Sequence, residues 1–219
     1  LFLDFALFYC DIQDTPPRFS ETRSIDSPHP TVKKVAMELF IIRHGQSANN
    51  ILDDVSKRDK DPPLTEIGER QADIVADFLA AGRHLMPGER SMGRPHFDYL
   101  YCSPMLRSLQ TVEPIGRKMG VTPEVWIDIH EVGGIYLDHG EDGGIVGYPG
   151  ETRRQIMDRF PGYILPDNLG DRGWWGKEKE EEHSSQGRAI GVADALRDRA
   201  GEHQRIGMIS HGGFMGYLL

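Results

Sequence analysis

A chain of 219 residues, of which 38% are hydrophobic and 27% charged, has the composition of a soluble globular protein and can bury one substantial core. The formal net charge of −9 argues against broad nucleic-acid binding, because a phosphate backbone would meet net repulsion. The two cysteines, Cys10 and Cys102, form neither a C-x-x-C pair nor a Cys/His array with zinc spacing, which indicates a reducing compartment.

The chain opens on an apolar run, Leu1 to Cys10, that is too short to span a bilayer. This run contains Asp4 and lacks a basic leading region, so it makes a poor signal peptide. We therefore expect a cytoplasmic protein without a membrane partner. A start other than methionine suggests a processed, cropped or fragmentary chain. An added strand, or a hydrophobic arm that docks on the domain, is an equally good interpretation of the run.

Prolines among polar residues at positions 11–31 indicate a linker. We predict an N-terminal extension over residues 1–34 and one folded domain over residues 35–219. The domain should begin with a strand over residues 37–42. Thr65 then caps a predicted helix, and a second strand follows over residues 97–102. The apolar positions of this helix have helical spacing: Ile67, Ile74, Val75, Phe78 and Leu79.

The next predicted helix ends at Gly120, a usual position for a C-terminal glycine. Its apolar face consists of Met105, Leu109, Val112, Ile115 and Met119. Alternating Val125, Ile127 and Ile129 predict a third strand, and Arg205 to Ser210 predict a fourth. A helix with Ile190, Val192, Ala193 and Leu196 precedes the fourth strand.

This order of strands and helices predicts an α/β fold, a three-layer sandwich with a mostly parallel central sheet and helices on both faces. A glycine-rich stretch at about 133–183 interrupts the order and is predicted to be a cap-like insertion over the active face. Within it, Trp174-Trp175 favours a hydrophobic clamp over a substrate platform. The charged run Lys177 to Glu182 is most simply a solvated loop or helix start.

Polar groups follow each predicted strand at the edge where parallel strands end. Arg43-His44 follows the first strand, Ser103 with Arg107 the second, Glu131 the third and His211 the fourth. Together they offer a nucleophile, positive charges and an acid. Such a set suits a phosphate.

In these stretches the chain resembles the histidine phosphatase superfamily, whose fold is phosphoglycerate mutase-like. The resemblance covers roughly residues 37–216, and four ordered elements at strand ends are far more specific than one Arg-His-Gly tripeptide. They are Arg43-His44-Gly45-Gln46-Ser47 with Asn50, Cys102-Ser103-Pro104-Met105-Leu106-Arg107 with Gln110-Thr111, Glu131, and Ser210-His211-Gly212-Gly213.

The resemblance implies hydrolysis of a small phosphorylated substrate, a phosphomonoester, without a metal or cofactor. His44 would form a phosphohistidine and Glu131 would donate the proton, with Arg43, Arg107 and His211 completing the catalytic set. The implied substrate-binding residues are Arg43, Gln46, Ser47, Asn50, Arg107 and Gly212. Asn49 departs from the family pattern, in which many members have a tryptophan at this position.

Several alternatives stay open at this stage. His130 and Asp128 lie close enough to Glu131 in sequence to be confused with it. Glycolytic mutases carry a Leu-Asn-Glu-Arg-His-Tyr-Gly stretch, which is missing here, so mutase-type phosphoryl transfer is the weaker enzyme hypothesis. The third hypothesis is a module that binds a phosphate ligand without catalytic turnover. The sequence stops at Leu219, eight residues after His211, which suggests a cropped chain.

Overall fold

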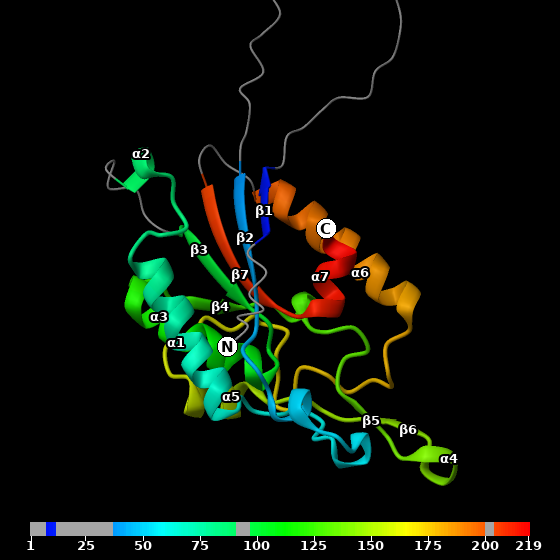
Figure 1. Ribbon diagram of the computed structural model, residues 1–219. Coiled ribbons are helices and arrows are strands. Elements are labelled where there is room, and N and C mark those ends of the chain that lie inside the picture. The colour runs from blue at the N-terminus through cyan, green and yellow to red at the C-terminus, as the bar shows by residue number, and fades with distance from the viewer. Residues whose placement is uncertain (1–7, 12–36, 91–96, 200–203) are drawn as a thin grey trace, which may run out of the picture.

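The computed structural model describes residues 8–11, 37–90, 97–199 and 204–219 (Figure 1). Its centre is a five-stranded sheet with the strand order β1-β2-β7-β3-β4. The strands are β1 (Phe8–Asp11), β2 (Met37–Arg43), β7 (Gln204–Ser210), β3 (Tyr99–Cys102) and β4 (Pro123–Val125). The last four are parallel, whereas β1 pairs with β2 in the antiparallel sense. The four parallel strands therefore end at one edge of the sheet.

Helices cover both faces of this sheet, which confirms the predicted three-layer α/β fold. In Figure 1, α1 (Glu66–Ala80) and α3 (Leu106–Met119) lie on one side, and α6 (Glu182–Arg199) and α7 (Gly212–Leu218) on the other. Alternate residues of β2 divide between the two faces, as in any strand. Both sets are buried because both faces are covered.

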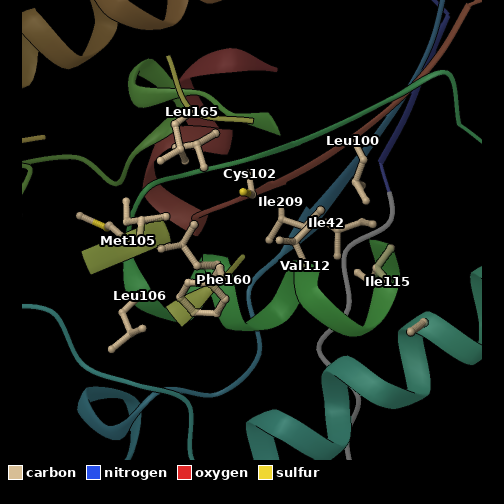
Figure 2. Close-up of a cluster of buried hydrophobic side chains, with 14 of the residues drawn as sticks. Ile42, Leu100, Cys102, Met105, Leu106, Val112, Ile115, Phe160, Leu165 and Ile209 are labelled. Atoms are coloured by element: carbon tan, nitrogen blue, oxygen red, sulfur yellow. The ribbon is translucent and has the colours of Figure 1, made fainter. Parts of the chain in front are cut away.

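The larger core lies between the sheet and the layer of α1 and α3. Figure 2 shows side chains of β2, β3 and β7, among them Ile42, Leu100 and Ile209, beside Val112 and Ile115 of α3. Residues of the long insertion, Phe160 and Leu165, reach the same cluster. The insertion therefore adds to the core of the domain. None of the helices in the described ranges is long and apolar enough to cross a bilayer.

The predicted start of α1 and the predicted end of α3 are confirmed. The Thr65 side chain accepts a hydrogen bond from the Gly68 N–H at 3.1 Å and caps α1, and Gly120 ends α3 in the left-handed conformation with a φ of 68°. The predicted face of α1 was partly wrong. Ile67 and Ile74 are 48% and 46% exposed, because the buried face also uses Ala72 and Ala76, two small residues.

The predicted third strand was also partly wrong. Strand β4 ends at Val125, and residues Ile127–Ile129 form a 3-10 helix, η3. The chain leaves the sheet after Trp126, whose N–H still bonds to the Cys102 carbonyl at 2.9 Å. Through this turn the chain passes from one face of the sheet to the other: Val125 belongs to the core beside α1 and α3, whereas Ile129 is buried in the core on the opposite face.

The insertion at about 133–183 contains short elements separated by loops. They are β5 (Tyr136–Asp138), α4 (Gly140–Gly143), β6 (Ile145–Gly147) and α5 (Arg153–Arg159), and β5 and β6 form a separate antiparallel pair. Trp174 is buried, and the rings of Trp174 and Trp175 lie 5.2 and 5.0 Å from that of His130. The remaining short helices are η1 (Ala48–Ile51), η2 (Val55–Lys57) and α2 (Pro87–Arg90).

The loop after β2 approaches the start of α1 so closely that a side chain does not fit. A Cβ added at Gly68 would lie 2.1 Å from the Gln46 carbonyl oxygen, which is backbone and cannot rotate away. We therefore expect Gly68→Ala to destabilise the fold by about 1–3 kcal/mol, as other overpacked sites do. Gly191→Ala in α6, where nothing lies within 4 Å, should instead be neutral or stabilising. Urea unfolding of both variants measures the difference, and equal stability would contradict this account.

Candidate active site

The first feature of the site is a pair of histidines at the ends of neighbouring strands. His44 follows β2 and His211 follows β7, and the His44 N–H continues the pairing of these strands by donating to the Ser210 carbonyl at 3.1 Å. The two imidazole rings consequently lie 5.0 Å apart between centroids. His44 is 8% exposed and His211 is fully buried.

The orientation of the His44 ring determines which nitrogen can act. Nδ1 lies 2.7 Å from the Gly45 carbonyl oxygen, an acceptor, so this nitrogen carries the proton and donates it. Nε2 is then the unprotonated nitrogen, and it accepts a hydrogen bond from Nε of Arg107 at 3.1 Å. Burial, followed by the charge of Arg107, lowers the pKa of His44 to about 3; the Gly45 bond opposes this shift, and the charge of Arg43 adds a smaller lowering. The His44 ring is therefore neutral, with an unprotonated Nε2.

This protonation state can be measured directly. With a pKa of about 3, about one His44 ring in a hundred is protonated at about pH 5, whereas an ordinary histidine is almost fully charged there. We expect the ¹⁵N shifts of His44 to keep the pattern of a neutral ring protonated at Nδ1 from about pH 8 to about pH 5. A His44 midpoint near 6.5 would contradict the assignment.

Arg107, the second residue of α3, lies with its side chain largely buried beside His44. Its Nη1 is 3.7 Å from Oδ1 of Asp61, and the same oxygen accepts the N–H of Leu106 at 3.1 Å. Asp61 thus connects the loop before α1 with the first turn of α3 and with its arginine. Burial raises the pKa of Asp61 to about 7, although Arg107 and the Leu106 N–H oppose the rise. Sequence reasoning missed Asp61, because an aspartate in a polar loop gives no sign of its distant partner.

His211 is held from the neighbouring strand. Its Nε2 lies 2.8 Å from the hydroxyl of Ser103, which follows β3 and also accepts the Met105 N–H at 3.2 Å. Burial, with the nearby Arg107, lowers the pKa of His211 well below its ordinary value. The second histidine is therefore neutral as well. Ser103, one of the polar residues expected at a strand end, thus holds the His211 ring in place.

Glu131 reaches the site from the turn after η3. Its Oε1 accepts the N–H groups of Val132 and Phe214, both at 2.9 Å, and its Oε2 accepts that of Gly213 at 3.3 Å. A Cβ at Gly213 would lie 2.6 Å from Oε1, so a glycine there permits this approach. Both carboxyl oxygens thus accept hydrogen bonds at the start of α7.

The turn that carries Glu131 is secured by residues that the sequence did not reveal. Nη1 of Arg188 in α6 donates to the carbonyl oxygens of Asp128 at 2.7 Å and His130 at 2.9 Å. Arg188 is itself paired with Glu180, at 2.6 Å between Nη2 and Oε2. Glu180 is therefore an exception to the predicted solvated charge run. Of the alternative acids, Asp128 and His130 do not line the cavity described next, whereas Glu131 does.

A cavity of about 260 Å³ opens above the strand ends. Of the predicted site residues, Arg43, His44, Ser47, Asn50, Arg107 and Glu131 line it. Gln46 does not, because its side-chain oxygen accepts the Thr65 hydroxyl at 2.8 Å. Gly212 does not line it either, but a Cβ there would lie 3.6 Å from Nε of Arg43. His211 does not line it, although its ring lies 5.0 Å from that of His44. Two basic residues that the sequence analysis did not select, Arg58 and Lys60, also line the cavity.

The predicted binding residues after His44 form a compact turn. The Asn50 side-chain oxygen accepts both the N–H and the hydroxyl of Ser47, at 2.8 and 2.9 Å. Asn49 forms two further hydrogen bonds, with the carbonyl and the N–H of Asp59, at 2.7 and 3.0 Å. The residue that departs from the family pattern therefore anchors the loop that carries Arg58 and Lys60.

Comparison with known proteins agrees with this architecture. A sequence model of the histidine phosphatase superfamily (branch 1) matches residues 39–219. The chain belongs to this superfamily, which confirms the resemblance stated from its motifs. Family membership supports a phosphatase-type function.

Individual relatives are distant. The structure of the ecdysone phosphate phosphatase from Bombix mori, in complex with tungstate, is 14% identical and covers 82% of this chain and 74% of its own, with a TM-score of 0.53. This likeness shows a shared fold. A mycobacterial glucosyl-3-phosphoglycerate phosphatase is 20% identical over 81% of this chain and 77% of its own, with a TM-score of 0.44.

A curated relative matches a shorter stretch. The PE-PGRS family protein PE_PGRS11 of Mycobacterium tuberculosis is 28% identical over 98 residues, which make up 44% of this chain. The match spans 15% of the length of that relative.

Proposed function

We propose that the protein hydrolyses a small phosphomonoester through a phosphohistidine on His44. The observation that carries this proposal is the orientation of the His44 ring, whose Nδ1 is bonded to the Gly45 carbonyl while Nε2 faces Arg107 at the cavity. An unprotonated ring nitrogen beside two arginines is what attack on a phosphate requires.

In the first step the phosphate lies between the guanidinium groups of Arg43 and Arg107. The N–H that Arg107 now donates to Nε2 turns to a phosphate oxygen, and this frees the nitrogen lone pair. Nε2 forms a bond to phosphorus as the ester P–O bond breaks, and Glu131 gives its proton to the departing oxygen. In the second step Glu131 takes a proton from water, which attacks phosphorus and releases inorganic phosphate and His44.

The two roles of Glu131 make different demands on its carboxyl group. The three backbone N–H donors suit the ionised form, which the second step uses as a base. The first step needs the protonated form, and an arriving phosphate dianion favours it because like charges repel. We infer that the bound substrate keeps Glu131 protonated for the first step.

Glu131→Gln tests the acid role through the leaving group. Alkoxide leaving groups need a proton far more than nitrophenolate does. We therefore expect kcat/KM, which reports the first step and not the hydrolysis of the phosphohistidine, to fall by about 10²-fold for an alkyl phosphate and much less for 4-nitrophenyl phosphate. Steady-state kinetics on both substrates gives the comparison, with Glu124→Gln, on β4, as the control. An equal loss on both substrates would contradict the acid role.

The reaction type is tested by incubating the protein with 4-nitrophenyl phosphate and, separately, with 2- and 3-phosphoglycerate. We expect release of inorganic phosphate, unchanged by a metal chelator. Interconversion of the phosphoglycerates without phosphate release would favour a mutase. Binding of phosphate without any turnover would favour a binding module. Either result would overturn the proposal.

A further inference from the structure

The mouth of the cavity carries more positive charge than one phosphate group needs. Four basic side chains line it, Arg43, Arg58, Lys60 and Arg107, against the carboxylates of Asp59 and Glu131. Arg43 and Arg107 flank His44 and belong to the transferred phosphate. Arg58 and Lys60 come from a different segment, the loop between η2 and α1.

A second observation is that neither cation forms an ion pair with the described residues. Within the described ranges, no carboxylate lies within 4 Å of the Arg58 guanidinium or the Lys60 ammonium group. By contrast, Lys57 in the same segment pairs with Asp54 at 3.8 Å and does not line the cavity. The protein has a net charge of −9, so two cations that have no carboxylate partner in the described ranges and line the same cavity are a local departure from the overall negative charge.

The loop that carries them is fixed by hydrogen bonds on several sides. Asn49 binds the backbone of Asp59 on both its N–H and its carbonyl, and the Asp59 side chain accepts the N–H of Asp61 at 3.0 Å. The Lys60 ammonium lies 5.2 Å from the centre of the Tyr148 ring, beyond β6. Asp59 carries a negative charge between the two cations, so the local excess there is one positive charge.

We propose that Arg58 and Lys60 form a subsite for a second anionic group, a carboxylate or a further phosphate, on the leaving group of the substrate. This inference rests on the proposed function, since the transferred phosphate has to occupy the arginines beside His44. The cavity volume of about 260 Å³ is below the usual range for drug-sized ligands, so the substrate is short. The apolar residues Pro62, Met105 and Val132 also line the cavity and can contact a small carbon frame.

The test compares three ligands on a three-carbon frame: glycerol 1-phosphate, 3-phosphoglycerate and propane-1,3-diol bisphosphate. Their affinities are measured by calorimetry on the His44→Ala protein, which cannot turn them over. We expect one or both doubly anionic ligands to bind about tenfold tighter than glycerol 1-phosphate, with the advantage shrinking as salt is added. The tighter of the two identifies the second anion as a carboxylate or a phosphate.

Variants distinguish binding at the subsite from general electrostatic attraction by the protein. The double change Arg58→Gln and Lys60→Gln should abolish the preference, lowering the affinity for the doubly anionic ligands about tenfold more than that for glycerol 1-phosphate. Lys57→Gln removes a charge from the same segment and should leave the preference intact. Equal affinities for all three ligands, an equal loss on all three in the double variant, or the same effect from Lys57→Gln would overturn the proposal.

The two proposals fail in different ways. If the parent protein releases no phosphate from any ligand while His44→Ala still prefers the doubly anionic ones, the hydrolysis proposal is wrong and the subsite stands. If the parent hydrolyses all three ligands with equal kcat/KM and the affinities are equal, the subsite is wrong and the hydrolysis proposal stands.

Discussion

Replacing His44 by alanine is expected to lower kcat for 4-nitrophenyl phosphate by at least about 10⁴-fold, because no other imidazole of the described residues lines the cavity. His211 is the nearest imidazole, but it is fully buried and its Nε2 is bonded to the Ser103 hydroxyl. Release of nitrophenolate, followed at substrate concentrations well above KM, measures the loss in kcat.

The matched control is His183→Ala, which removes an exposed imidazole from α6. This variant should keep the parent rate, and His44→Ala should unfold as cooperatively as the parent. A His44→Ala protein that remains folded and retains more than about a tenth of the parent kcat would mean that the nucleophile is elsewhere.

Arg107→Lys is expected to lower kcat/KM by about 10³-fold even though the charge is retained. A lysine ammonium cannot offer a planar fork to phosphate, nor does it reproduce the 3.1 Å contact of Nε with His44. The guanidinium also brings Asp61, the first turn of α3 and the nucleophile together, so its loss disturbs the position of His44 as well as phosphate binding.

Arg117→Lys on the same helix is the control for this change. Arg117 is exposed, pairs with Glu113 at 3.3 Å and should tolerate the replacement. Inhibition by vanadate distinguishes the cause, since Arg107→Lys should weaken vanadate inhibition in parallel with kcat/KM. A variant with unchanged kcat/KM and unchanged inhibition would remove Arg107 from the site.

The part of the fold that the sequence predicted best is the part set by local patterns. Strands β2 and β7 contain the apolar runs 39–42 and 206–209, and α3 has both a regular apolar face and a terminal glycine, so their limits could be predicted closely. The strand-end residues Arg43, His44 and His211 follow from the same patterns. Once the sheet is parallel, its topology alone brings them together.

What the sequence could not predict depends on contacts between distant segments. Asp61 looks like any loop aspartate until α3 is placed against it, and Arg188 looks like a surface arginine of α6 until the turn after β4 accepts its N–H groups. The segment through η3 has the apolar alternation of a strand, but Ile127 packs against one core and Ile129 lies in the other, whereas residues two apart in a strand would share one face. Arg58 and Lys60 carry no motif, and the cavity alone distinguishes them from other surface charges.

The central claim is that a phosphoryl group becomes attached to His44. Rapid mixing with ³²P-labelled phenyl phosphate, followed by an alkaline quench and peptide mapping, tests it most directly. The account predicts an acid-labile, base-stable label on the peptide that contains His44, absent from His44→Ala and discharged as inorganic phosphate on further incubation. Label on another residue, or turnover at the parent rate by an enzyme that never becomes labelled even at the shortest quench times, would contradict it.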